Sequence, residues 1–352
     1  MKNRLLIIIG VILISLFGLF MVYSSSNVWA EYKYHNAYKY VINQGIFFII
    51  GLVLMFIISK IDYKIYEKYA NKIIIACIIL LILVLIPGIG SVRNGSRSWF
   101  KIGSFGIQPS EFTKIGLIIF TSKYLVKNKK ILSIILFTLF IFALIMLQPD
   151  FGTGSVLVMS IFGILFIEGM DIKIILKLSS IGLVGVVLLI IVAPYRLARI
   201  LSFLNPWSDP LGSGFQIIQS LYAIGPGGLF GMGVGNSIQK YFYLPEPQTD
   251  FIFSIISEEF GFMGALIVTS LFLIIIINGF IVSYKSNDLF GKYLSFGIIF
   301  SLSFQALLNL MVVVGLVPVT GVTLPFLSYG GSSLLISMIS IGILLNISRN
   351  NS

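Results

Sequence analysis

The sequence predicts an all-α integral membrane protein that crosses the bilayer about ten times, with two large loops on one side of the membrane. Hydrophobic residues make up 57% of the chain, charged residues only 11%, and the mean hydropathy is +1.03. This composition excludes a compact water-soluble domain. Long apolar runs recur along the whole chain, and they are continuous rather than alternating, which favours membrane helices over the strands of a barrel.

Ten apolar runs, taken with their polar flanks, are long enough to cross about 30 Å of hydrocarbon as helices. We predict spans near residues 4–23, 45–59, 73–86, 112–126, 131–147, 152–167, 173–193, 251–283, 293–316 and 329–347. The first run follows Lys2 and Arg4 as a secretory signal would, but its apolar core is long and no small-residue cleavage site follows it. We therefore predict that it is an uncleaved first span.

The distribution of Lys and Arg predicts that both termini lie in the cytoplasm, because short cytoplasmic loops of membrane proteins are enriched in these residues. With the amino terminus inside, fifteen Lys and Arg residues fall in the predicted inner segments and eight in the outer ones. The net charge of +11 then reflects topology and attraction to anionic membrane lipids, and it requires no nucleic acid partner.

The rarest residues exclude several kinds of site. The single Cys77 lies inside an apolar run and has no partner for an internal disulfide, while the single His35 lies in the first outer loop. Neither residue supports a metal centre or a His-based triad. The segment Gly231–Gly235 follows no predicted strand and precedes no suitably placed lysine, so it does not indicate a nucleotide site.

The chain is predicted to form a single transmembrane domain, residues 1–352, in which two outer loops are far longer than a crossing requires. These loops cover residues 87–111 and 194–250, and they hold the Gly, Pro, Arg and Asp residues that the spans exclude. Binding and catalytic residues concentrate in loops that a rigid scaffold positions, so we expect the functional site here.

Asp250 is the residue that most needs an explanation. The segment Tyr243–Asp250 ends the second outer loop and opens directly into the eighth span, which places this carboxylate where water meets the membrane. Burying an ionisable group near hydrocarbon is costly unless the group has a function. The alternative is that Thr249 or Asp250 only caps the helix. Glu246, four residues earlier, could assist Asp250 or could merely extend the loop.

Two other acids, Glu111 and Asp150, also lie at the outer ends of predicted spans. For Asp150, capping and a functional role are equally good explanations, because it directly precedes the helix start. Lys114 follows Glu111 by one helical turn on the same face. A plain ion pair and a polar cavity between the helices explain these two residues equally well.

Arg93, Arg97 and Lys101 form a basic cluster on the side of the membrane that usually has few cations, next to Trp99. An anionic partner outside the membrane would explain them, because guanidinium groups suit bidentate contact with phosphate. The alternative is a solvated loop with an aromatic anchor.

The middle of the second outer loop, Gly214–Leu221 followed by Gly225–Gly231, is amphipathic and rich in glycine. We predict short helices that lie along the outer interface, with turns that let the backbone approach a ligand. A purely structural lid is the alternative.

Five segments, in order along the chain, resemble the SEDS proteins (shape, elongation, division and sporulation), the family of FtsW and RodA. These segments are Asn94–Trp99, Gln108–Lys114, Gln148–Gly154, Tyr243–Asp250 and Pro318–Ser333. The first 85 residues are similar to the family only in having hydrophobic spans. The segments Pro245–Asp250 and Gly321–Pro325 resemble the division or sporulation branch more than the elongation branch. We prefer an FtsW-like assignment, with SpoVE-like and RodA-like ones left open.

The resemblance implies a peptidoglycan glycosyltransferase that joins lipid II, a disaccharide-peptide on a polyprenyl diphosphate, into glycan strands outside the bacterial cytoplasmic membrane. Asp250 matches the essential acid of the family and would act as base toward the acceptor hydroxyl. Because an α-linked donor gives a β-linked polymer, we expect one inverting displacement without a nucleophilic carboxylate. Arg97 and Lys114 would hold the diphosphate, with Glu111 orienting Lys114. The candidate substrate contacts are Arg93, Arg97, Lys101, Glu111, Lys114, Gln219, Lys240, Glu246 and Ser328.

The resemblance also implies a protein partner, a class B penicillin-binding protein that crosslinks the strands. The sequence contains no cluster of metal ligands, although a divalent cation, Mg²⁺ or Mn²⁺, could assist at the diphosphate. Two other functions stay open, namely a lipid II flippase or transporter and a non-catalytic scaffold for the penicillin-binding protein. The polar motifs gather on the outer side, whereas a transporter should carry charges near the membrane midplane, which favours the enzyme.

Overall fold

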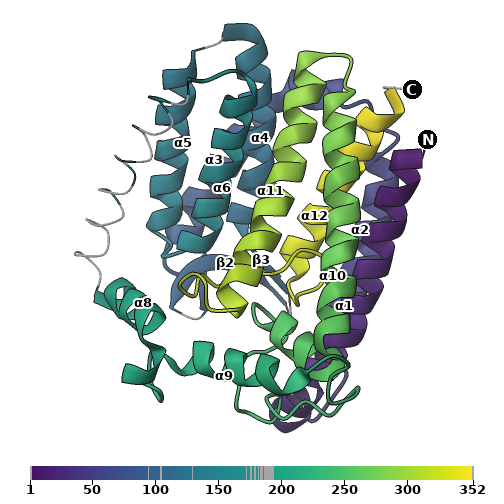
Figure 1. The fold of residues 1–352 in the computed structure, drawn as a ribbon. Coiled ribbons are helices and arrows are strands. Elements are labelled where there is room, and N and C mark those ends of the chain that lie inside the picture. Colours follow the sequence, from purple (N-terminus) through teal and green to yellow (C-terminus); the bar gives the residue numbers. More distant parts are fainter. Residues whose placement is uncertain are drawn as a thin grey trace.

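The computed structural model describes residues 2–93, 95–103, 105–128, 130–171 and 194–350, together with isolated positions between residues 173 and 185. In this part of the chain, helices run roughly parallel to one another and form a bundle (Figure 1). The helices are α1 (Lys2–Tyr34), α2 (Lys39–Ile58), α3 (Lys64–Leu85), α4 (Pro109–Asn128), α5 (Ile131–Met146), α6 (Phe151–Ile167), α8 (Pro194–Leu204), α9 (Phe215–Ile224), α10 (Ile252–Tyr284), α11 (Leu289–Val313) and α12 (Gly331–Asn350).

The helices confirm a mostly helical protein that crosses the membrane several times. Within the described residues, six helices, namely α1, α2, α3, α10, α11 and α12, are long and apolar enough to cross a bilayer, and α5 and α6 are shorter apolar helices. Each predicted span coincides with a helix, with one exception. The predicted span 173–193 lies outside the described residues, apart from a few single positions.

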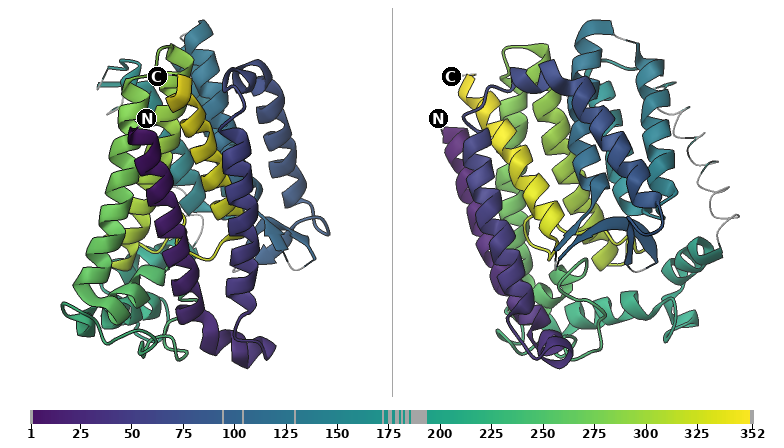
Figure 2. Two further views of the ribbon diagram at one scale, coloured as in Figure 1. Left: turned by 90° about the vertical axis from the view of Figure 1, so that its right-hand side faces the viewer. Right: turned by 180° about the vertical axis from the view of Figure 1, so that it is seen from behind.

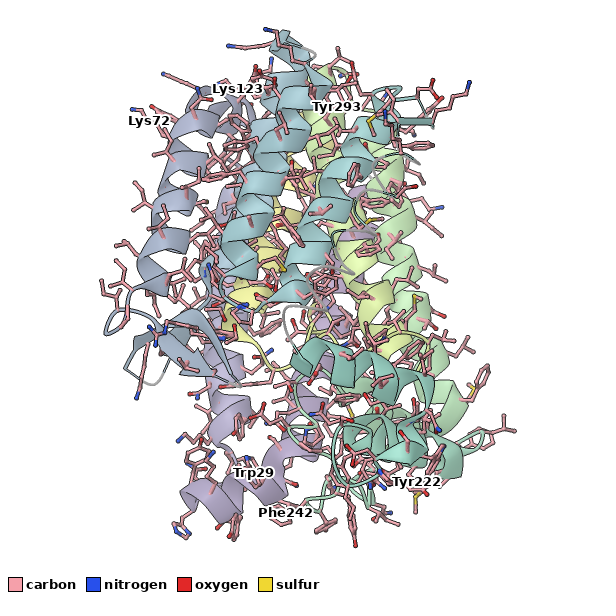
Figure 3. The ribbon with its side chains drawn as sticks, turned by 90° about the vertical axis from the view of Figure 1, so that its left-hand side faces the viewer. Trp29, Lys72, Lys123, Tyr222, Phe242 and Tyr293 are labelled. Atoms are coloured by element: carbon pink, nitrogen blue, oxygen red, sulfur yellow. The ribbon has the colours of Figure 1, made fainter. Side chains whose placement is uncertain are left out.

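Both termini lie at one end of the bundle, whereas α8, α9 and the strands lie at the opposite end (Figures 1 and 2). Side chains mark the same two ends. Lys72 and Lys123 lie at the end that carries the termini, and Trp29, Tyr222 and Phe242 lie at the other (Figure 3). The two long loops therefore gather at a single end, as expected for loops that four predicted spans separate. We call this the loop end of the bundle.

Helix α1 is longer than its predicted span. It has 33 residues, which corresponds to about 50 Å at 1.5 Å per residue, whereas the apolar run ends near residue 23. At the loop end, the last turns of α1 bend and run across the axis of the bundle (Figure 2). Its last three turns therefore follow the predicted apolar run.

The first long loop folds into a three-stranded antiparallel sheet of β1 (Ser91–Arg93), β2 (Ser96–Ile102) and β3 (Phe105–Ile107), in that order. The prediction of an all-α fold did not include this sheet. Gly95, with a φ of 81°, makes the turn between the first two strands. The Ser96 hydroxyl donates a hydrogen bond to the carbonyl of Gln148, which fastens the sheet to the segment before α6.

Helix α10 is broken at Gly261, whose φ of 61° and ψ of −153° are not helical. The break releases backbone groups from the helical ladder, and the segment 227–233 pairs with them. The amide of Met232 donates to the carbonyl of Glu258 at 2.8 Å, and the amide of Phe262 donates to the carbonyl of Gly228 at 2.9 Å. The second long loop is thus attached to α10 through the main chain.

Replacing Gly261 with alanine is expected to destabilise the protein. A Cβ there would collide with the amide nitrogen of Gly231 and lie 2.7 Å from the carbonyl oxygen of Gly227, in a left-handed conformation that costs about 1–3 kcal/mol. Gly45→Ala is the matched control, because Gly45 is helical and a Cβ there meets nothing within 4 Å. Thermal unfolding in detergent should show a lower Tm for Gly261→Ala only. Equal Tm values would contradict a tight fit of the loop against the break.

Candidate functional site

Asp250 lies at the loop end, half-buried, immediately before α10. The hydroxyl of Thr249 donates to its Oδ1 at 2.8 Å. The N-cap residue of α10 is Phe251, whose side chain has no atom that could cap a helix. Neither Thr249 nor Asp250 therefore occupies the capping position that the alternative explanation assigned to them.

Asn309 in α11 holds the main chain at Asp250. Its Nδ2 donates to the carbonyl oxygen of Asp250 at 2.7 Å and to that of Val322 at 2.8 Å, and the side chain is fully buried. Val322 belongs to the loop between α11 and α12, residues 314–330, which we call the α11–α12 loop. A second bond joins the same segments, because the amide of Tyr329 donates to the carbonyl of Gln248 at 2.8 Å. The Asp250 segment is thus fixed to the α11–α12 loop at two points.

Glu111 and Lys114 form an ion pair, with Nζ and Oε2 2.9 Å apart and both side chains at most 7% exposed. The ammonium also donates to Oε1 of Gln305 at 2.6 Å, and Nε2 of Gln305 donates to the carbonyl of Thr323 at 3.0 Å. A cavity of about 20 Å³ lies beside the pair, which is room for about one water molecule. Both explanations of the pair are therefore partly right, since it is an ion pair beside a small polar cavity. Through Gln305, the Glu111–Lys114 pair supports the α11–α12 loop at Thr323, next to the residue that Asn309 holds.

Asp150 caps α6. Its Oδ1 accepts from the amide of Thr153 at 3.1 Å, as the capping explanation predicts. Its Oδ2 accepts from Nε2 of Gln108 at 2.8 Å and from the hydroxyl of Ser110 at 3.2 Å. The carboxylate therefore also joins the start of α6 to the start of α4.

The basic cluster lies on the sheet. The guanidinium of Arg93 stacks over the ring of Trp99, 5.0 Å from its centroid, while Arg97 is half-buried and Lys101 is exposed. Because side chains alternate along a strand, Arg97, Trp99 and Lys101 share one face of β2. The structure thus places the three predicted cations on one small element at the loop end.

The remaining predicted contacts are scattered. Lys240 is buried, with its Nζ 3.3 Å from Oε1 of Glu259 and hydrogen-bonded to the carbonyl of Gly235 at 2.5 Å. Ser328 is also buried, and its hydroxyl accepts from the amide of Leu324 at 2.8 Å within the α11–α12 loop. The present contacts of both side chains are structural, and their assignment to the substrate stays a prediction.

Gln219 and Glu246 are more accessible. Gln219 lies half-buried on α9, and the next residue, Ser220, donates to the carbonyl of Val313 at 2.6 Å, which attaches α9 to the end of α11. Glu246 is exposed with a φ of 45°, and its carbonyl accepts from the amide of Thr249 at 3.0 Å. This tight turn leads directly to Asp250.

Sequence reasoning missed three buried amides that organise the site. They are Gln44, Gln305 and Asn309, at most 2% exposed. Gln44 in α2 donates to the carbonyl of Ser328 at 2.9 Å and accepts from the amide of Gly330 at 3.2 Å. A signal existed for the other two, because Gln305 and Asn309 lie four residues apart on one face of an apolar helix, where polar side chains are expensive.

The site offers proton-transfer chemistry and anion binding. Asp250 is a half-buried carboxylate next to the start of α10, and the sheet with the basic cluster lies at the same end of the bundle as the start of that helix (Figure 1). Among the residues that the structure describes, no group of three or more His, Cys, Asp or Glu side chains could hold a metal ion.

Known proteins resemble the chain over its whole length. The sequence profile of the FtsW, RodA and SpoVE family, described as cell cycle protein, matches residues 4–352. The chain is 50% identical to stage V sporulation protein E of Bacillus subtilis, with 99% of this chain and 97% of that protein covered. It is 41% identical to the probable peptidoglycan glycosyltransferase FtsW of Trichlorobacter lovleyi, with 98% and 92% covered.

Solved structures show the same similarity. One chain has a TM-score of 0.81 and 29% sequence identity, with 98% of this chain and 97% of that chain covered. Its structure is described as structural coordination of polymerization and crosslinking by a peptidoglycan synthase complex. The rod shape determining protein RodA of Thermus thermophilus has a TM-score of 0.72 and 27% identity, with 98% and 96% covered.

Proposed function

This chain belongs to the SEDS family of FtsW, RodA and SpoVE, and we propose that it is a peptidoglycan glycosyltransferase that polymerises lipid II with Asp250 as the base. The observation that carries this assignment is the half-exposed Asp250 carboxylate, held by its main chain to the α11–α12 loop through Asn309. The family confirms the resemblance that the five sequence segments indicated. Identity to the SpoVE protein exceeds identity to the FtsW protein, which favours a sporulation role over the FtsW-like assignment.

In the proposed reaction, Asp250 takes the proton of the acceptor sugar hydroxyl as that oxygen attacks the anomeric carbon of lipid II. The bond from this carbon to the diphosphate breaks, and polyprenyl diphosphate leaves with the electron pair. The configuration inverts from α to β in one step. An inverting displacement needs no carboxylate as nucleophile, so a single acid at the reacting centre is sufficient.

The leaving diphosphate requires positive charge, and Arg93, Arg97 and Lys101 on the sheet supply it. Arg97 and Lys101 share a face of β2, which suits two contacts with one diphosphate. We infer a different role for Lys114, because its ammonium already contacts Glu111 and Gln305. In this proposal, Lys114 and Glu111 stabilise the α11–α12 loop. The loop in turn helps to hold Asp250, so the pair affects the substrate only indirectly.

The orientation follows from the charges at the two ends. The end that carries the termini also carries Lys72 and Lys123, and cytoplasmic faces are enriched in such residues (Figure 3). We therefore place the termini in the cytoplasm and Asp250 outside the cytoplasmic membrane. A class B penicillin-binding protein is the proposed partner, because the similar chain of known structure belongs to a peptidoglycan synthase complex.

Purified protein given lipid II in detergent tests the function. Glycan polymer should form there, although no membrane has to be crossed. A flippase or a scaffold would form none. The polar contacts described above gather at the loop end of the bundle rather than at its midplane, which supports the enzyme over the transporter.

Asn309→Leu is expected to lower kcat for polymerisation about 100-fold, because a small misplacement of a catalytic group can cost that much. KM for lipid II should change much less, since the variant releases Asp250 rather than the diphosphate site. Gln44→Leu is the matched control, because it removes a buried amide that holds the other end of the α11–α12 loop. Equal losses of kcat in the two variants would mean that Asn309 only stabilises the loop.

A further inference from the structure

A groove of about 500 Å³ lies on the last turns of α1, at the loop end of the bundle. Tyr23, Asn27, Glu31 and Tyr32 of α1 line it, together with Phe242 from the second long loop. The groove is rich in aromatic rings that remain accessible, since Tyr32 is 71% exposed and Phe242 is 50% exposed. None of these residues takes part in the site around Asp250 described above.

The rings of the groove are held in fixed positions. The ring of Phe242 lies 5.6 Å from that of Trp29 and 5.3 Å from that of Tyr32, both in edge-to-face geometry. On the other side, Tyr23 stacks with Tyr38 at 5.3 Å. Phe242 has a φ of 69°, which is unusual for a bulky residue and costs free energy that the surrounding contacts must offset. The loop is therefore shaped to bring this ring against α1.

The groove lies at the outermost part of the loop end. Trp29 and Tyr32 follow the end of the predicted span at Tyr23 by about two to three helical turns. Trp29 and Phe242 both lie at the end of the bundle away from the termini (Figure 3). A cluster of exposed rings next to a groove indicates a binding surface.

The groove is connected to Asp250 by the chain itself. Phe242 directly precedes the segment Tyr243–Asp250, and this segment is held at its start and near its end. Leu244 is buried, with its amide donating to the carbonyl of Gln239 at 2.9 Å, and the carbonyl of Gln248 accepts from Tyr329. A polymer made at Asp250 must leave over the surrounding surface. The segment Tyr243–Asp250 connects Asp250 to Phe242, which lines the aromatic groove, so the groove lies on a possible path of the polymer.

We propose that the groove binds the growing glycan strand, an oligosaccharide of N-acetylhexosamines, as it leaves Asp250. Aromatic rings can pack against the apolar faces of sugar rings, while the carboxylate of Glu31 and the amide of Asn27 can take up sugar hydroxyls and acetamido groups. This proposal deepens the proposed function and rests on it. The groove holds the product, whereas Asp250 acts on the acceptor.

Binding is measured with a lipid-free tetrasaccharide of alternating N-acetylglucosamine and N-acetylmuramic acid, added to purified protein in detergent. The chain has three tryptophans, and a Trp99→Phe, Trp207→Phe background leaves Trp29 as the fluorescent reporter. We expect a saturable change of Trp29 fluorescence, with affinity lowered about tenfold or more by Phe242→Ala. Absence of a saturable change, or an unaltered affinity in Phe242→Ala, would overturn the proposal.

The same titration separates this proposal from the proposed function. Asp250→Asn should still bind the tetrasaccharide, whether or not it polymerises, so loss of activity in that variant does not affect the groove. In polymerisation assays, Tyr32→Ala with Phe242→Ala should give shorter glycan strands. Trp207→Ala is the control, because Trp207 and Tyr222 form another exposed aromatic pair, with ring centroids 5.8 Å apart, at the same end. Equal shortening in the control, or unchanged strand length in the groove variant, would contradict a glycan site.

Discussion

Asp250→Asn is expected to yield a folded protein whose rate of lipid II polymerisation is lower by about 100- to 10,000-fold, because a general base contributes about that much. An asparagine amide keeps the size of the side chain but cannot take up the proton of the acceptor hydroxyl. The measurement is the initial rate of polymer formation from lipid II by purified protein in detergent.

The variant should fold because the two hydrogen bonds described at this position survive the change. The amide oxygen of asparagine can still accept the bond from Thr249, which the Oδ1 of Asp250 accepts at 2.8 Å. Asn309 donates its hydrogen bond to the main-chain carbonyl of residue 250, and this group is present whatever the side chain is. The Tm in detergent should therefore stay close to that of the wild type.

Asp209→Asn is the matched control, because it makes the same chemical change in the same long loop. Asp209 is exposed, and hydrogen bonds from the amide and hydroxyl of Ser213 lower the pKa of its carboxyl group. This control should polymerise lipid II at nearly the wild-type rate. If Asp250→Asn retained a rate within a few-fold of the control, Asp250 would not be the base.

Lys114→Met is expected to destabilise the protein by about 3–5 kcal/mol, because it leaves the buried carboxylate of Glu111 without its cation. It also removes the bond of 2.6 Å to Gln305, which holds Thr323 of the α11–α12 loop. Chemical or thermal unfolding in detergent measures the loss. Lys123→Met is the control, because Lys123 is accessible and its polar contact among the described residues is a long one, 3.5 Å to Asn71.

The double variant Glu111→Gln, Lys114→Met distinguishes bracing from direct substrate contact. It removes both charges, so much of the stability should return, since removal of a complete buried pair is often nearly neutral. If Lys114 only braces the α11–α12 loop, polymerisation should recover with stability. A stable double variant that remained inactive would assign Lys114 to the diphosphate instead.

The helices were predictable because each depends on a local property, the apolar run. The position of Asp250 was predictable for the same reason, since it directly precedes such a run. The sheet was not predicted, because β1 and β3 have only three residues each, too few for a periodic pattern. The stacking of Arg93 on Trp99 then depends on the register of this sheet.

Lys240 shows why the rest of the site could not be predicted. In the sequence it is a cation of an outer loop, and this position predicts a contact with the substrate. Its burial against Glu259 requires that the loop folds back onto α10 at the Gly261 break, which is a tertiary contact. The amides Gln305 and Asn309 were visible in the sequence, but their partners lie on segments that only the fold brings together.

The hydrogen bond from Asn309 to the main-chain carbonyl of Asp250 allows this position to be modified chemically. Because the attachment uses an atom shared by all amino acids, the location of the α-carbon at position 250 is independent of the reactive group it carries. A cysteine introduced there would therefore stand where the carboxylate stood. Electrophilic sugar analogues could then be tethered to it covalently, which would capture otherwise short-lived complexes for imaging.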